Sequence, residues 1–237
     1  MDRTETVAPY PNPRSIGVVY LLYFLVALLG GFLLKGITVP GDAAATAANL
    51  IAHEARFRAG FALGILGNVL YLALTALFYW LFRPVNRSVS MAAAFFSVVG
   101  CAIQTLGGIF QLAPLVILKD APLASSVGVE QLQRAALLSF TLYAQTYTMG
   151  LAFFACFDLL LGYLILRSTF LPRALGALLI AAGVGWLFVL WPPLATALAS
   201  VILPLGGLAE VALMLWLLVK GVDAERWQEM GREPGTG

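Results

Sequence analysis

The sequence predicts an all-α integral membrane protein, a six-transmembrane-helix bundle with an amphipathic surface helix between spans one and two. Of its 237 residues, 61% are hydrophobic and only 11% are charged, and the mean hydropathy is +0.91. A soluble domain has about 45–50% apolar and about 25% charged residues. Six apolar segments also occur, each with the roughly 20 residues needed to cross a hydrocarbon core of about 30 Å. Because the connectors are short, little of the chain remains for a soluble domain.

The elements of the N-terminal part can be placed in order. Residues 1–14 are polar and contain three prolines, which is typical of a flexible tail. Span one covers residues 15–34. Asp42 is placed to cap a helix over Ala43–Arg58, and the mixture of apolar and charged side chains in that helix favours a position along the membrane surface. Span two then covers residues 60–82.

The remaining spans follow with shorter breaks. Span three covers residues 91–118. Span four belongs to a helix over residues 129–166 that is longer than a bilayer requires, so its polar first turns should emerge from the membrane. Span five covers residues 174–191, and after an uncharged turn at Trp191-Pro192-Pro193 span six follows to Val219. Residues 221–237 are polar again and form a second predicted tail.

The distribution of lysine and arginine predicts the orientation of the domain at residues 15–220. With six spans, both termini lie on the same side as the connectors at residues 83–87 and 167–173. That side carries nine basic residues and the other side five, and we therefore expect a cell (inner) membrane protein with both termini cytoplasmic. The nine are Arg3, Arg14, Arg83, Arg87, Arg167, Arg173, Lys220, Arg226 and Arg232; the five are Lys35, Arg56, Arg58, Lys119 and Arg134.

Asp158 and Glu210 are the only acidic side chains within the apolar segments, and those segments contain no basic ones. A carboxylate in hydrocarbon costs several kcal/mol, so such a residue normally faces the bundle interior and has a function. Asp158 precedes Arg167 by nine residues and Glu210 precedes Lys220 by ten, which places both roughly 14 Å from the inner helix ends. Two close carboxylates do not both ionise cheaply, so we predict proton carriers or catalytic acids. The alternative is a structural role, with each acid protonated or capped by a neighbouring hydroxyl or carbonyl.

Polar side chains gather in the outer halves of spans two, three and four. Asn68 lies in span two, Gln104 and Gln111 in span three, and Gln145 and Tyr147 in span four. All lie outward of the two acids, whereas the inner halves are almost purely apolar. Hydrogen bonding between helices is the first interpretation of such residues. The alternative is a ligand pocket that opens outward and ends at the acids.

Several classes of protein are disfavoured by what the chain lacks. Cys101 and Cys156 are not spaced as a metal or redox motif, and His53 alone cannot form a zinc site. There is no phosphate-binding glycine loop, nucleophile elbow, haem-type histidine pair or intramembrane lysine. We therefore expect no metal and no cofactor. The net charge of +2 is too small to indicate a nucleic-acid partner.

Four segments carry a family resemblance. They are VPGDAAATAAN at residues 39–49, LFRPVNR at 81–87, LGYL at 161–164 and FLPR at 170–173. These segments resemble a signature of the bacterial "domain of unknown function 4386" membrane family, and the likeness extends from span one to span five. The resemblance implies a bacterial multi-pass membrane protein and no assigned activity.

Three functions remain open at this point. The first is binding or transport of a small or lipidic ligand in an intramembrane pocket, with Asp158 and Glu210 as proton carriers. The second is an integral membrane enzyme that acts on a lipid or isoprenoid by carboxylic general-acid catalysis. The third is a structural or accessory membrane protein. Membrane lipid is the expected partner in each case, and the oligomeric state is left open.

Overall fold

The computed structural model describes residues 12–232, which contain helices and no strand. Six helices in this range are long and apolar enough to cross a membrane, which confirms the predicted fold class. They are α1 (Pro13–Leu34), α3 (Glu54–Phe82), α4 (Arg87–Lys119), α6 (Val129–Arg167), α7 (Arg173–Leu187) with its extension η1 (Phe188–Leu190), and α8 (Pro192–Val219). The shorter helices are α2 (Ala43–Ala52), α5 (Ala121–Val127) and α9 (Ala224–Arg232).

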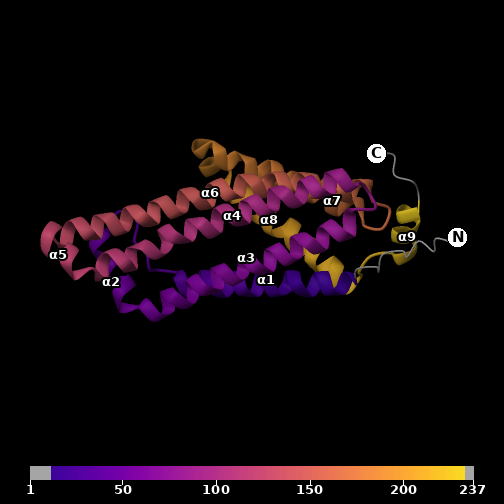
Figure 1. Cartoon of the computed structure of the whole chain (residues 1–237). Coiled ribbons are helices and arrows are strands. Elements are labelled where there is room, and N and C mark those ends of the chain that lie inside the picture. The colour runs from indigo at the N-terminus through magenta and orange to yellow at the C-terminus, as the bar shows by residue number, and fades with distance from the viewer. Residues whose placement is uncertain (1–11, 233–237) are drawn as a thin grey trace.

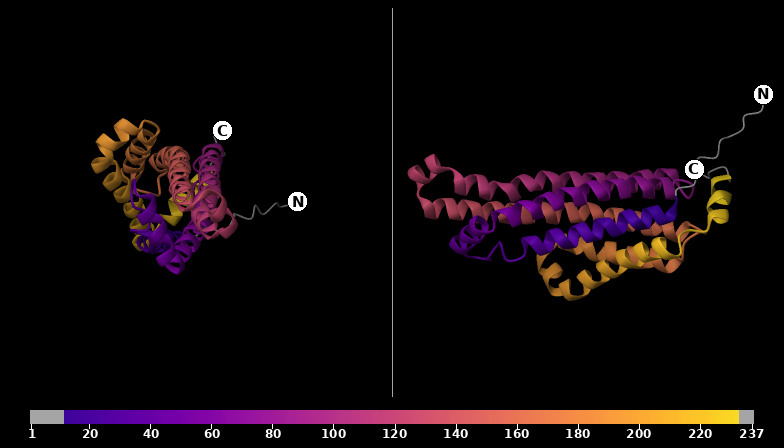
Figure 2. Two further views of the ribbon diagram at one scale, coloured as in Figure 1. Left: turned by 90° about the vertical axis from the view of Figure 1, so that its left-hand side faces the viewer. Right: turned by 90° about the horizontal axis from the view of Figure 1, so that it is seen from below.

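The six long helices form a ring in which each packs mainly against its two neighbours. The order around the ring is α1, α3, α4, α6, α7 and α8, and α8 returns to α1. The left view of Figure 2 looks along the helices, and Figure 1 shows them from the side. The start of α1 lies with α9 at one end, called here the inner end, and α2 and α5 lie at the opposite, outer end. An even number of spans requires this arrangement.

Glycines bring neighbouring helices together in the inner half of the ring. A Cβ atom on Gly17 of α1 would lie 2.6 Å from the backbone nitrogen of Leu218 in α8. On Gly162 of α6 it would lie 2.7 Å from the carbonyl oxygen of Gly176 in α7. Small residues permit such backbone-to-backbone contact in membrane helices. Large side chains such as Phe82 and Leu213 are fully buried in this half of the ring.

A C-terminal helix covers the inner end. Helix α8 ends at Val219, and Gly221, whose φ of 74° suits glycine, closes it: the Gly221 amide donates to the Trp216 carbonyl at 2.9 Å. The chain then turns into α9, where Trp227 is only 4% exposed and its Nε1 donates to the Leu81 carbonyl at 2.8 Å. Part of the segment predicted as a polar tail is therefore a packed helix. Residues 1–11 and 233–237 of the two predicted tails lie outside the described residues.

The predicted surface helix at the outer end is shorter than expected. Asp42 caps its start, because the Asp42 Oδ1 atom accepts from the Ala45 amide at 2.8 Å, but α2 ends at Ala52 and the next residues belong to α3. The reason lies in Glu54, the first residue of α3, which pairs with Arg58 one turn later and with Lys119 at the end of α4. These charges stabilise the first turn of α3 instead of prolonging α2.

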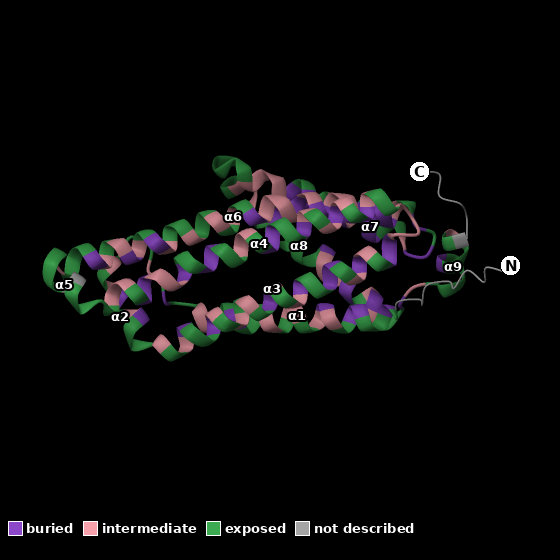
Figure 3. Cartoon of the chain, viewed as in Figure 1, coloured by how far each residue is buried: buried purple, intermediate pink, exposed green. Residues whose placement is uncertain are grey.

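The spans differ greatly in length. Helix α6 has 39 residues, or about 58 Å, whereas α7 with its extension has 18 residues, or about 27 Å. The α7–α8 hairpin therefore turns back well before the outer ends of α4 and α6, as Figures 1 and 2 show. Exposed residues prevail on the outside of the spans in Figure 3, and many of them are large and apolar, as suits contact with lipid.

The contact at Gly17 generates a stability prediction. We expect Gly17→Ala to lower the free energy of unfolding by about 1–3 kcal/mol, because the new methyl group meets the backbone of α8, which cannot move aside. Gly31→Ala in the same helix is the matched control, since a Cβ there meets nothing within 4 Å. Thermal unfolding in detergent measures both, and equal melting temperatures would contradict the close contact.

Candidate functional site

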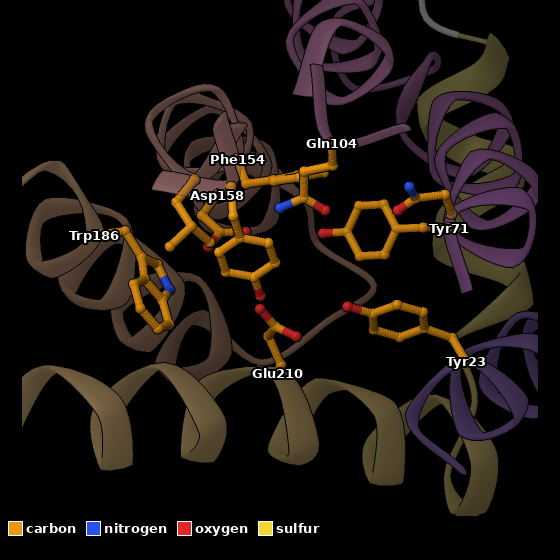
Figure 4. A pocket seen from close by; sticks show the side chains of 10 residues that line it. Tyr23, Tyr71, Gln104, Phe154, Asp158, Trp186 and Glu210 are labelled. Atoms are coloured by element: carbon orange, nitrogen blue, oxygen red, sulfur yellow. The ribbon is translucent and has the colours of Figure 1, made fainter. Parts of the chain in front are cut away.

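All six spans contribute to one cavity inside the ring. Its volume is about 130 Å³. Figure 4 shows the side chains that surround it. The lining residues are Tyr23 of α1, Asn68 and Tyr71 of α3, Gln104 of α4, Tyr147, Leu151, Phe154 and Asp158 of α6, Trp186 of α7 and Glu210 of α8. The cavity is therefore a product of the whole bundle and not of one helix pair.

The two intramembrane acids meet at this cavity. Asp158 is 3% exposed and Glu210 is half-buried, and the two are close enough for their charges to interact. Among residues 12–232, neither carboxyl group has a hydrogen-bond partner. The oxygens of both groups are not completely buried. The carboxyl oxygens therefore face the cavity. The structural alternative, in which a hydroxyl or carbonyl caps each acid, has no contact to support it in this part of the chain.

The predicted pocket residues lie at different places along the bundle. Asn68, Gln104 and Tyr147 line the cavity together with the acids. Gln111 is buried and lines a second cavity, which lies further towards the outer end. Gln145 is exposed and is not among the residues that line the cavities described here. Because Gln145 and Tyr147 are two residues apart on a helix, they point to different faces, and only Tyr147 turns inward.

Two further cavities extend outward from the acids. The middle cavity, of about 220 Å³, shares Tyr23, Asn68, Gln104 and Tyr147 with the cavity at the acids. The outer cavity, of about 630 Å³, shares Leu34, Gln111 and Tyr143 with the middle one and lies beneath the loop that precedes α2. The shared lining places the three cavities next to one another, in a row that runs from the outer end of the bundle to Asp158 and Glu210; we call this row the path.

The ring is incomplete in the outer half of the bundle. Only α1, α3, α4 and α6 line the middle cavity, and α7 and α8 contribute nothing there. The close contact of α8 with α1 lies at Gly17, near the inner end. In the outer half α8 has crossed over to α7 (Figure 1), and Tyr147 on α6 is 44% exposed. In the outer half, therefore, neither α7 nor α8 stands between α1 and α6, and the middle cavity lies beside this position in the ring.

Two residues that line the cavity were not predicted from the sequence. Tyr23 lies in the middle of α1, although tyrosine and tryptophan gather at the ends of membrane spans, and this position was the available signal. Trp186 gave no such signal, because its place depends on α8: a Cβ on Gly206 would lie 2.5 Å from the Trp186 ring.

In residues 12–232 no three His, Cys, Asp or Glu side chains are grouped to hold a metal ion.

Hydrogen bonds between spans are also present, as the first interpretation of the polar residues predicts. Thr75 of α3 donates to the Tyr71 carbonyl at 2.8 Å, so Ser97 of α4, 2.6 Å away, donates to the Thr75 hydroxyl. The Asn68 amide donates to Thr105 at 3.0 Å. Asn68 thus both links α3 to α4 and lines the cavity, so the two interpretations hold together at this residue.

The fold and the cavity define a multi-pass membrane protein with an acidic site inside its helix bundle. The chain belongs to the family described as a domain of unknown function, DUF4386, whose model matches residues 15–221. This match confirms the resemblance found in the sequence. The chain is also 25% identical over 154 residues to a protein of Archaeoglobus fulgidus described as uncharacterized, a match that covers 65% of this chain and 78% of that protein. No solved structure matches the chain.

The lack of partners for the acids generates a prediction. Asp158→Asn should leave the melting temperature unchanged or raise it, because no hydrogen bond is lost and the repulsion from Glu210 is relieved. Thr75→Val is the contrasting variant, expected to cost about 0.5–1.5 kcal/mol because it removes the buried hydrogen bond between the Thr75 and Ser97 hydroxyls. Thermal unfolding of both proteins tests this, and a marked loss in Asp158→Asn would favour a structural acid.

Proposed function

We propose that the protein binds or transports a small or lipidic ligand in the intramembrane cavity that ends at Asp158 and Glu210. The observation that carries the proposal is the convergence of all six spans on one cavity that contains both acids. A bundle that needed only to be stable would fill this space with apolar side chains, because buried carboxyl groups without partners are costly.

The access path supports this function. A ligand that dissolves in the bilayer reaches the middle cavity between α1 and α6 and moves inward from there. On the opposite route, large side chains are buried in the inner half and α9 packs across the inner end. Access from one side at a time is what a transporter requires of each of its states. Asp158 and Glu210, at the closed end, take up and release protons as the ligand arrives and leaves.

The orientation belongs to the same proposal. Nine basic residues on the inner side against five on the outer side support a cell (inner) membrane protein with both termini cytoplasmic. The cavity then opens away from the cytoplasm.

Filling the cavity tests ligand binding. Leu151→Trp places a larger side chain in the cavity at the acids, whereas Leu138→Trp on the same helix is a matched control at a position that is 58% exposed. We expect mass spectrometry of the purified proteins to find one class of small molecule or lipid enriched over the bulk membrane in the parent and in Leu138→Trp. That class should be lost from Leu151→Trp. Equal profiles in all three proteins would argue against a ligand site.

Mass spectrometry of whole-cell lipids distinguishes the enzymatic alternative. If the protein is an enzyme, lipid extracts of cells that carry the gene should contain a chemically altered lipid. Asp158→Asn should abolish this product while the folded yield stays normal. Extracts without such a product, together with an enriched ligand on the protein, favour binding or transport.

Cysteine labelling tests the orientation. Ser88 follows the connector at the inner end and Ser125 lies in α5 at the outer end, and both are exposed. We expect a membrane-impermeant thiol reagent to label Ser125→Cys in intact cells, and Ser88→Cys only after the membrane is opened. The parent protein reports any background from Cys101 and Cys156. Labelling of both positions from the same side would refute the topology.

A further inference from the structure

Resting on the proposed function, we infer that the ligand is an amphiphilic organic amine that binds as its ammonium ion. Its charged head lies at Asp158 and Glu210, and its apolar chain follows the middle and outer cavities. The inference names the class of ligand for the same site, and it rests on the charge, the hydrogen-bonding groups and the shape of the path.

The charge along the path has one sign. Asp158 and Glu210 are the only charged residues that line the three cavities, and no Lys, Arg or His from residues 12–232 lines any of them. The acids also lack a hydrogen bond to this part of the chain. A buried carboxylate without a counter-charge is stabilised most by a cation that enters with the ligand. An anionic ligand would meet repulsion with nothing to offset it.

The hydrogen-bonding groups suit an ammonium ion. An alkylammonium has three N–H donors and no acceptor, and an ionised carboxylate accepts only. Figure 4 shows the Glu210 carboxyl group, the Tyr23 and Tyr71 hydroxyls and the Gln104 amide directed into one space. Carboxylate, hydroxyl and amide oxygens there are enough to accept all three protons of the ammonium group.

An aromatic wall completes the site for the head group. The Tyr71 ring meets Tyr23 and Phe154 edge to face, at centroid distances of 4.9 and 5.0 Å. Phe154 and Trp186 line the same cavity. Rings from several helices that hold one another in place keep the cavity open, and their faces attract cations. Carboxylates together with aromatic rings recognise an ammonium better than a neutral polar group.

The size and lining of the path suit a single apolar chain behind the head. The cavity at the acids, about 130 Å³, is close to the roughly 150 Å³ that holds a benzene ring, so it admits a head group and not a whole lipid. The lining of the middle cavity includes the apolar side chains of Ala27, Phe61 and Leu63 beside its polar ones. Tyr147 lines both cavities, so the polar head of the ligand joins its apolar chain near this residue.

Calorimetric titration of the full-length protein in a non-ionic maltoside detergent tests the inference. The probes are octylammonium, neutral octanol and anionic octanesulfonate, which differ in the charge of the head group. The variants are Asp158→Asn, Glu210→Gln and the double variant, with Glu130→Gln as the matched control. Glu130 is an exposed carboxylate on α6, paired with Arg134. Each variant is first checked for cooperative unfolding, and the single variants serve if the double variant does not fold.

We expect octylammonium to bind the parent and Glu130→Gln at least tenfold more tightly than octanol does, with this preference lost in the acid variants. Octanol should bind the parent and the acid variants alike. Equal binding of octanol and octylammonium to the parent, abolished by Leu151→Trp, would overturn the amine while leaving the proposed ligand site intact. Tighter binding of octanesulfonate would also overturn it. Equal binding of every probe to the parent and to Leu151→Trp would remove the ligand site as well.

Discussion

Backbone contact at glycines in the inner half of the ring is the constraint on which the rest of the structure depends. Where Gly17 meets Leu218 and Gly162 meets Gly176, the helices touch without intervening side chains. Membrane helices gain no hydrophobic energy from leaving lipid, so close packing must hold them together. Once the inner ends are fixed in this way, the tilt of α8 and the shape of the outer half follow.

Unequal helix lengths make the outer half of the ring different from the inner half. The short α7 ends well before the outer end of the longer α6. The α7–α8 hairpin therefore lines only the inner half of the ring. The outer half is left to four long helices, and the middle cavity lies among them, beside the position between α1 and α6 that α7 and α8 leave empty.

Polar groups in this bundle fall into two kinds that differ in their energetics. The Thr75 and Ser97 hydroxyls are buried and satisfy each other, so they stabilise the contact between α3 and α4. Asp158 is just as buried, but within the described residues nothing caps it and it shares a cavity with a second acid. The pair therefore contributes no hydrogen bond to stability among the described residues, unlike the Thr75–Ser97 contact.

The fold class and the six spans could be predicted from the sequence because they depend on hydropathy, and the depth of both acids was predicted from the constant rise per residue along a helix. The start of α3 could not be predicted, because it depends on the pairing of Glu54 with Lys119, which lies 65 residues away in the chain. The order of the ring, the places of Tyr23 and Trp186 in the cavity and the exposed position of Gln145 are visible only in the folded chain. Those outcomes depend on how each helix is rotated about its axis, which is set by packing against neighbours distant in the sequence.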